Sequence, residues 1–180
     1  MDEHVEASIT AIADLQHGVL SSSQAQAGGL TRGMIGARLR SGRWERAGDG
    51  IYRVGGAPST WRQRLWVALL DAGPTAVVSH RSAGALRHLR GFREGPIEVT
   101  KRSRLDHRVS SGVRHESRRL PANHTERVDG FPCTTLARTV FDLCAGQHPK
   151  RAARIVDNAI VDNGLAIEQL DEVLGDLAKR

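Results

Sequence analysis

The stretch Ser21-Ser22-Ser23-Gln24-Ala25-Gln26-Ala27-Gly28-Gly29-Leu30-Thr31 decides how the N-terminal part of this chain folds. Ser21 and Gln24 have the spacing of a capping box, in which each side chain binds the other residue's backbone N–H at the start of a helix. The two glycines are typical of a helix end, and Thr31 is a residue type that begins the next helix. The stretch therefore predicts two helices joined by a short turn that contains glycine, which is the helix-turn-helix arrangement.

The segments on either side of this turn complete a small domain. Upstream, apolar residues at helical spacing predict a helix that ends at about Gln16. Downstream, the helix after Thr31 runs to about Ser41, and two short alternating stretches, residues 44–47 and 51–54, flank an Asp-Gly turn signal. Three helices followed by a two-stranded ribbon is the order of a winged helix-turn-helix, which we expect over residues 1–57.

The pattern changes after a Gly- and Pro-containing segment at residues 54–59. Beyond it, helical segments that begin near capping residues alternate with short strand-like stretches, and an Asp-Gly signal at residues 127–132 predicts a second hairpin. The expected helix starts are Thr60, with Gln63 completing a capping box, then Ser79, Thr134 or Thr135, and Pro149. We therefore expect an α+β protein in which the winged helix-turn-helix precedes a mixed α/β domain over residues 58–180.

Length and composition narrow the class of protein. The chain has 180 residues, of which 39% are hydrophobic and 26% charged, values typical of a soluble globular protein. No apolar run approaches the eighteen residues of a transmembrane helix, and the N-terminus lacks the apolar segment of a secretory signal. The two cysteines, Cys133 and Cys144, do not form a disulfide framework. We expect a cytoplasmic protein that does not contact a membrane.

Positive charge is concentrated in two places. The formal net charge is +6, but residues 58–130 alone carry fourteen basic residues against seven acidic ones. Between Arg32 and Arg53, six arginines accompany only Glu45 and Asp49. Basic clusters of this kind attract polyanions and accelerate the encounter with them.

The helix after Thr31 has the composition of a surface that enters a DNA groove. On a helical wheel Ile35 and Leu39 face the core, and the opposite side combines small residues with long hydrogen-bond donors, as a major-groove helix requires. Its glycines cost roughly 1 kcal/mol each relative to alanine, a cost that a close partner would explain. Arginines on the ribbon would bind phosphates. The expected DNA-binding residues are Thr31, Arg32, Gly33, Ala37, Arg38, Arg40, Arg43, Arg46 and Arg53.

Two sets of residues resemble the AbiEi family of type IV antitoxins, in its actinobacterial branch. The first is Gly18-Val19-Leu20-Ser21 with Gln24-Ala25 and Gly29-Leu30-Thr31. The second and more specific is Gly130-Phe131-Pro132-Cys133-Thr134-Thr135 with Arg138-Thr139 and Asp142-Leu143. The resemblance covers about residues 16–180.

The resemblance implies a transcriptional autorepressor whose N-terminal domain binds repeats of double-stranded DNA in its own promoter. It also implies a C-terminal domain that counteracts a cognate nucleotidyltransferase toxin. One winged domain reads a short site, so we expect a monomer or weak dimer that binds cooperatively to repeats. Many similar sequences continue into a nuclease-like domain, which leaves open that this chain is the regulatory N-terminal part of a longer protein.

An alternative places the function in the basic second domain, as a module that binds an acidic protein or an RNA. The residues that would form this partner surface are Lys101, Arg102, Arg104, Arg108, Arg118 and Arg119.

The sequence predicts no enzyme, cofactor or metal site. Glu98 and Lys101 are three apart, whereas a nuclease strand needs its acid and lysine two apart on one face. Ser79, His80 and Asp142 lack the Gly-x-Ser-x-Gly turn of a hydrolase, and Ser79 is interpreted as a helix cap. The pairs His80 with His88 and His107 with His115 are eight apart without a nearby cysteine, unlike zinc-site spacing.

Overall fold

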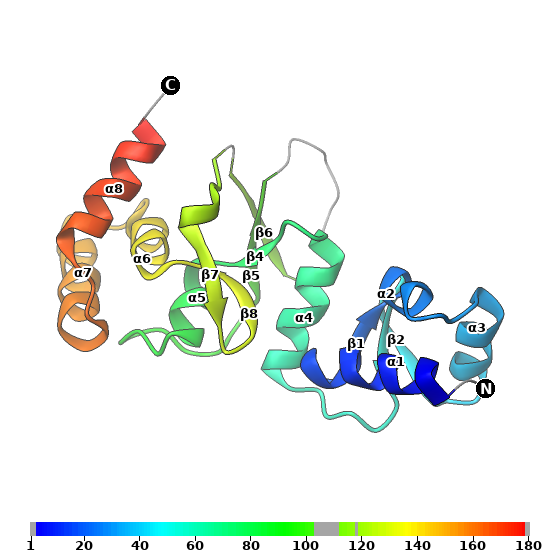
Figure 1. Ribbon diagram of the computed structural model, residues 1–180. Helices are drawn as coiled ribbons and strands as arrows, with labels where there is room; N and C mark the ends of the chain where they lie inside the picture. The colour runs from blue at the N-terminus through cyan, green and yellow to red at the C-terminus, as the bar shows by residue number, and fades with distance from the viewer. Residues whose placement is uncertain (1–2, 103–111, 118, 179–180) are drawn as a thin grey trace. The chain divides into compact units, whose positions relative to one another are not determined.

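The computed structural model describes residues 3–102, 112–117 and 119–178, and these form a mixed α+β protein with two compact units (Figure 1). Each unit contains one sheet. The first unit extends to Pro74 and comprises α1 (Glu3–Leu15), β1 (Val19–Ser21), α2 (Ser22–Ala27), α3 (Arg32–Arg40), β2 (Trp44–Gly48), β3 (Ile51–Val54) and α4 (Trp61–Ala72).

The predicted caps form as expected around the α2–α3 turn. The Ser21 hydroxyl accepts from the Gln24 backbone N–H at 3.1 Å, and the Gln24 side chain accepts from the Ser21 N–H at 2.9 Å, so the capping box is complete. Gly29 adopts a φ of +98°, a conformation that favours glycine. The Thr31 hydroxyl then caps α3 by accepting from the Met34 N–H at 3.2 Å. These contacts are local, which is why the sequence predicted them.

The sheet of the first unit has three strands, whereas the sequence predicted only the two of the ribbon. β1 pairs antiparallel with β3, and the strand order is β1-β3-β2. β1 has three residues and overlaps the capping box of α2, so it is too short to show an alternating pattern.

Both faces of this sheet are covered by helices. One face carries Leu20, Trp44 and Tyr52, which pack with apolar residues of α1, α2 and α3. The other face carries Val19 and Ile51, which pack against Val67 of α4.

The sequence expected the domain boundary between residues 57 and 58, but the first unit continues to Pro74. The reason is that α4 covers the second face of the sheet. Thr60 caps α4 as predicted, with its hydroxyl accepting from the Gln63 N–H at 3.0 Å. The Gln63 side chain does not complete a capping box; its amide instead donates to the His17 carbonyl at 3.0 Å and fastens α4 to the turn after α1.

The second unit is built around a mixed sheet of five strands, with the order β6-β5-β4-β8-β7. The β7–β8 pair is the hairpin predicted from its Asp-Gly turn, and β4 pairs parallel with β8 and antiparallel with β5. Its elements are β4 (Val77–Val78), α5 (His80–Leu86), β5 (Glu98–Lys101), β6 (Val113–Glu116), η1 (Ala122–His124), β7 (Thr125–Val128), β8 (Phe131–Thr134), α6 (Leu136–Cys144), α7 (Pro149–Asn163) and α8 (Ile167–Ala178).

Arg138 of α6 is the polar centre of this unit. It is 5% exposed, and its guanidinium donates to the Asp142 carboxylate at 2.8 Å, the Arg119 carbonyl at 3.1 Å and the Ser117 hydroxyl at 3.3 Å. Burial raises the pKa of Asp142, and the Arg138 charge counteracts that shift. Arg138 therefore holds α6 to the segment that follows β6, and Asp142 holds the Arg138 guanidinium from within α6.

Among the described helices, none combines the length and apolar character needed to cross a bilayer.

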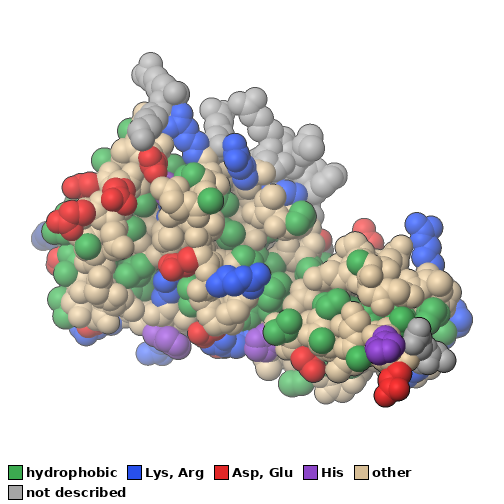
Figure 2. Space-filling model, in the orientation of Figure 1, with side chains coloured by type: hydrophobic (Ala, Val, Ile, Leu, Met, Phe, Trp, Pro, Cys, Tyr) green, Lys and Arg blue, Asp and Glu red, His purple; other side chains and the backbone are tan. Residues whose placement is uncertain are grey.

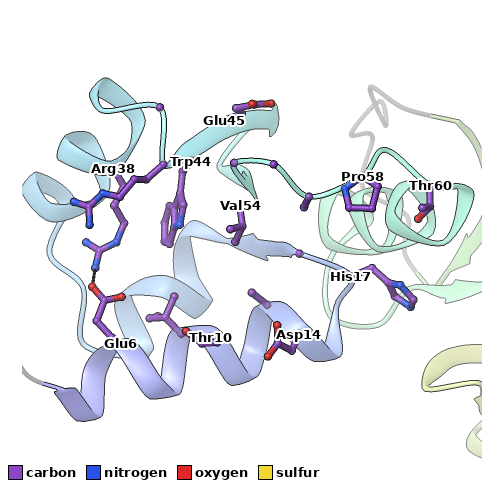
Figure 3. A pocket seen from close by; sticks show the side chains of 18 residues that line it. Glu6, Thr10, Asp14, His17, Arg38, Trp44, Glu45, Val54, Pro58 and Thr60 are labelled. Carbon is purple, nitrogen blue, oxygen red and sulfur yellow. Dashed lines mark hydrogen bonds and ion pairs between the residues drawn. The ribbon is translucent and has the colours of Figure 1, made fainter.

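Arg38 fixes the orientation of α3. The sequence placed it on a flank of the DNA-binding surface, but it is 3% exposed and forms an ion pair with Glu6 of α1 (Figure 3). Its guanidinium also lies 5.4 Å from the centre of the Trp44 ring, in cation–π geometry. The prediction of Arg38 as a DNA contact is therefore wrong, because that flank of α3 is the side that packs on α1 and β2.

We expect Arg38→Ala to lower the free energy of unfolding by about 2–3 kcal/mol, because it removes a charged hydrogen bond and leaves Glu6 without this partner. The cost stays below that of a fully buried pair because the Glu6 side chain is 39% exposed. The matched control is Arg32→Ala on the exposed side of α3, which should change stability by less than about 0.5 kcal/mol. Urea denaturation measures both, and equal losses would contradict the role given to Arg38.

Candidate nucleic-acid interface

The side of α3 opposite Arg38 is open to solvent. Arg32, Gly33 and Arg40 are exposed, whereas Ile35 is 4% exposed and packs in the core. Ala37 is half-buried at the edge of this surface. Thr31 is exposed as well, but its hydroxyl is engaged in the cap of α3. The helical wheel therefore assigned the core side and the exposed side of α3 correctly, apart from Arg38.

The two glycines of α3 have different surroundings. A Cβ built on Gly33 would meet a single atom of the described residues beyond the helix backbone, the Thr31 hydroxyl at 3.8 Å. A Cβ on Gly36 would lie 3.2 Å from a terminal nitrogen of Arg40, so the Arg40 side chain lies back along the helix over Gly36. Gly33 is thus a flat, unfilled position, and Gly36 leaves room for a guanidinium. We define Arg32, Gly33, Ala37 and Arg40 as the α3 ridge.

The ribbon adds two exposed arginines next to α3 in the sequence. Arg43 and Arg46 are both exposed, and the Arg43 Nε donates to the Ser41 hydroxyl at 3.3 Å. Arg53 differs, because it is half-buried and forms an ion pair with Glu45, its partner across the β2–β3 pair. A phosphate would have to displace Glu45 to reach Arg53, so the predicted role of Arg53 as a phosphate contact is not favoured.

Trp44 and Tyr52 hold the ribbon to the helices. Both rings are buried and stack with their centroids 5.6 Å apart. They are therefore not available to stack on bases. Figure 2 shows Lys and Arg side chains standing at the end of the first unit where α3 lies.

The first unit also contains a pocket of about 810 Å³ between α1 and the start of the ribbon (Figure 3). Trp44 and Val54 lie on its apolar side, and Glu6 and Asp14 of α1 on its polar side. Its lining includes Arg38 and Arg43 but no residue of the α3 ridge. The pocket and the ridge are therefore separate surfaces.

Of the six basic residues predicted as a partner surface, the structure describes three, and two of these, Arg102 and Arg119, line one pocket. Lys101 is half-buried at the end of β5, and Arg102 is exposed. Arg119 is half-buried and donates to the Asp176 carbonyl of α8 at 3.0 Å, so it connects elements of the fold. Arg104, Arg108 and Arg118 lie outside the described residues. Acidic side chains gather over α8 (Figure 2).

Sequence reasoning missed a cluster of three residues in the second unit. His80, Glu98 and His115 are separated by 17 residues or more along the chain, yet their ligand atoms all lie within 4.8 Å of one another. The His115 Nε2 lies 3.2 Å from the Glu98 carboxylate, and the His80 and His115 rings stack at 3.5 Å. Burial, reinforced by the charge of His115, lowers the pKa of His80 to about 4.

The imagined hydrolytic triad is not assembled by the described residues. The Ser79 hydroxyl lies 3.0 Å from the His80 Nδ1, but Ser79 is fully buried and accepts from the Thr100 hydroxyl at 2.8 Å. Asp142 is hydrogen-bonded to Arg138 rather than to His80. Ser79 is the N-cap residue of α5, as predicted, but its hydroxyl makes no cap hydrogen bond and instead contacts Thr100 and His80.

Comparison with known proteins leaves the family open. Neither a search of protein-family models nor a search of curated proteins found a match to this chain. A structural comparison found similarity to the crystal structure of the RV2827C protein from Mycobacterium tuberculosis, with 16% identity, a TM-score of 0.42, and coverage of 98% of this chain and 82% of that one.

Proposed function

We propose that the first unit is a winged helix-turn-helix that binds double-stranded DNA through the α3 ridge. The observation that carries this proposal is the exposed, unfilled position at Gly33, on a side of α3 that also carries the exposed Arg32 and Arg40. A helix that enters the major groove needs small side chains where its backbone approaches base edges, and arginines where it must reach guanine acceptors. The α3 ridge has both features.

The order of elements supports the same proposal. α2 and α3 are joined by a turn that contains two glycines, and the β2–β3 ribbon follows α3 directly. In this arrangement α3 is the recognition helix, and the ribbon is a wing that contacts the flanking backbone. The wing is short, with strands of five and four residues, so its role is phosphate contact by Arg43 and Arg46 rather than deep insertion into the minor groove.

The charges of the α3 ridge and of the ribbon arginines are available to a polyanion. Arg32, Arg40 and Arg46 are exposed and form no ion pair with a described carboxylate. Together with Arg43 they are the four arginines that remain as candidate DNA contacts, because Arg38 and Arg53 are removed from the arginines predicted from the sequence. Arg40 is assigned to a base, so if Arg32, Arg43 and Arg46 each neutralise one phosphate, log K falls with log salt with a slope of about −2.7 per bound protein.

We further propose that the chain is the autorepressor and antitoxin of a type IV toxin–antitoxin system, and that it counteracts a nucleotidyltransferase toxin. The support for this is the resemblance to the AbiEi family over Gly18–Thr31 and Gly130–Leu143. Two residues of the second motif, Arg138 and Asp142, form the buried ion pair at the centre of the second unit. Their role in the chain is to hold that unit together, so the surface that acts on the toxin consists of other residues.

For DNA binding, we expect the full chain to bind the region upstream of its own gene with the salt slope given above. Arg40→Ala should weaken binding to that region by about 1–3 kcal/mol and relax sequence preference, because Arg40 is assigned to a base. Arg46→Ala should weaken specific and unrelated DNA alike and reduce the slope by about 1, because Arg46 is assigned to a phosphate. Fluorescence anisotropy over a salt series measures these quantities.

The matched control is Arg64→Ala, which removes an exposed arginine from α4 of the same unit. It should leave affinity for the upstream region unchanged. A salt-independent signal with the parent chain, or equal losses for Arg40→Ala and Arg64→Ala, would overturn the assignment of the α3 ridge.

The antitoxin role is tested against the nucleotidyltransferase encoded beside the gene of this chain. Cells express that nucleotidyltransferase from an unrelated promoter, and we expect co-expression of the chain to restore their growth. The double variant Arg40→Ala/Arg46→Ala should restore growth equally well, because neutralisation is assigned to the second unit and not to DNA binding. Growth curves measure both. Failure of the parent chain to restore growth would refute the antitoxin role while leaving the DNA-binding prediction intact.

A further inference from the structure

Three segments of the second unit place His80, Glu98 and His115 together. His80 is the first residue of α5, directly beyond β4, Glu98 begins β5, and His115 lies in β6. The strands β4, β5 and β6 are neighbours at one edge of the sheet. Because β5 and β6 run parallel with Thr100 opposite His115, the side chains of Glu98 and His115 belong to the same face of the sheet.

The distances within the cluster are close to those of a metal-binding site. One nitrogen or oxygen of each residue lies within 4.8 Å of the corresponding atoms of the other two, and the His115 Nε2 is 3.2 Å from the Glu98 Oε2. Tetrahedral ligands about 2.1 Å from a zinc ion are about 3.4 Å apart. The His115–Glu98 pair already has about this separation, and the ligand atom of His80 lies no more than 4.8 Å from either of the other two.

We propose that His80, Glu98 and His115 bind one divalent transition-metal ion of the zinc class. Two imidazole nitrogens and one carboxylate oxygen are ligands that suit zinc and its first-row neighbours. The site is independent of the α3 ridge, and it ties the edge strand β6 to β5 and to the start of α5.

The surroundings of His80 orient its ring for this role. Its Nδ1 lies 3.0 Å from the hydroxyl of the buried Ser79, which in turn accepts from the Thr100 hydroxyl. Metal-binding histidines commonly use one ring nitrogen for such a second hydrogen bond, which leaves the other nitrogen for the metal. In His80 that remaining atom is the Nε2.

The backbone at His80 is strained in a way that supports a functional position. Its φ is +48°, in the left-handed region that residues other than glycine rarely adopt. Strain of this kind persists where the surrounding structure holds a side chain in one direction, and it gathers at binding sites. Here the residue with this backbone is the first of α5, and its imidazole stacks on that of His115.

Three protein ligands leave at least one coordination position for water or an exchanging ligand. The three side chains are half-buried rather than enclosed, so an ion can enter from solvent. The ion is therefore one that accepts water or an exchanging ligand at its remaining coordination position. Co²⁺ binds the same types of ligand and serves as a spectroscopic probe.

The test measures metal binding by the full chain after removal of any purification tag. Zn²⁺ is titrated in competition with a chromophoric chelator, and Co²⁺ is followed by its visible absorption. We expect one equivalent of Zn²⁺ and a rise in the midpoint of thermal unfolding when Zn²⁺ is added, because a ligand that binds only the folded state stabilises it. His80→Asn, Glu98→Gln and His115→Ala should each lower the Zn²⁺ affinity at least tenfold.

The control is His88→Asn, because His88 is exposed and, like His80, has a left-handed backbone, with a φ of +56°. Asparagine tolerates that conformation, so both Asn variants keep the fold while removing an imidazole. His88→Asn should bind Zn²⁺ like the parent. Absence of Zn²⁺ and Co²⁺ binding by the parent, or equal affinity of the parent and Glu98→Gln, would overturn the proposal. Glu98→Gln is nearly isosteric, so circular dichroism can verify that it folds.

Discussion

The ion pair between Arg38 and Glu6 is the interaction on which the proposed DNA-binding surface depends. It joins α1 to α3, and the cation–π contact with Trp44 joins both to the ribbon. A helix as short as α3 is marginal without tertiary packing, and two glycines weaken it further. Anchoring one side of α3 in this way determines which side remains outward, and that side carries Arg32, Gly33 and Arg40.

Local signals were enough to predict most elements of the first unit. The capping box at Ser21 and Gln24, the cap at Thr31 and the hairpin turn at Gly50 depend only on neighbouring residues, and each forms as predicted. Contacts over long sequence distances were not predictable in this way. The burial of Arg38 depends on Glu6, 32 residues earlier, and the boundary after Pro74 depends on which face of the sheet α4 covers.

The two candidate sites also differ in whether neighbouring residues or long-range contacts form them. The α3 ridge lies within nine consecutive residues, so a helical wheel identified it, apart from the flank that meets α1. The cluster of His80, Glu98 and His115 arises only because β5 and β6 pair in parallel beside the end of β4. Histidine spacing along the chain carried no signal of it. Charge counted along the sequence also did not show the role of the basic residues of the second unit. It predicted Arg119 as part of a partner surface, whereas the Arg119 side chain donates to the Asp176 carbonyl.

The substitution Gly33→Leu tests most directly whether the α3 ridge closes onto a duplex. Apart from the helix backbone and the two neighbouring residues, a Cβ at Gly33 meets no atom of the described residues closer than the Thr31 hydroxyl at 3.8 Å, and leucine favours helix formation more than glycine does. The variant should therefore be at least as stable as the parent in urea, yet bind the DNA upstream of its gene at least tenfold more weakly, because its side chain separates the helix from the bases. Parent-like affinity in the stable variant would contradict the placement of α3 in a DNA groove.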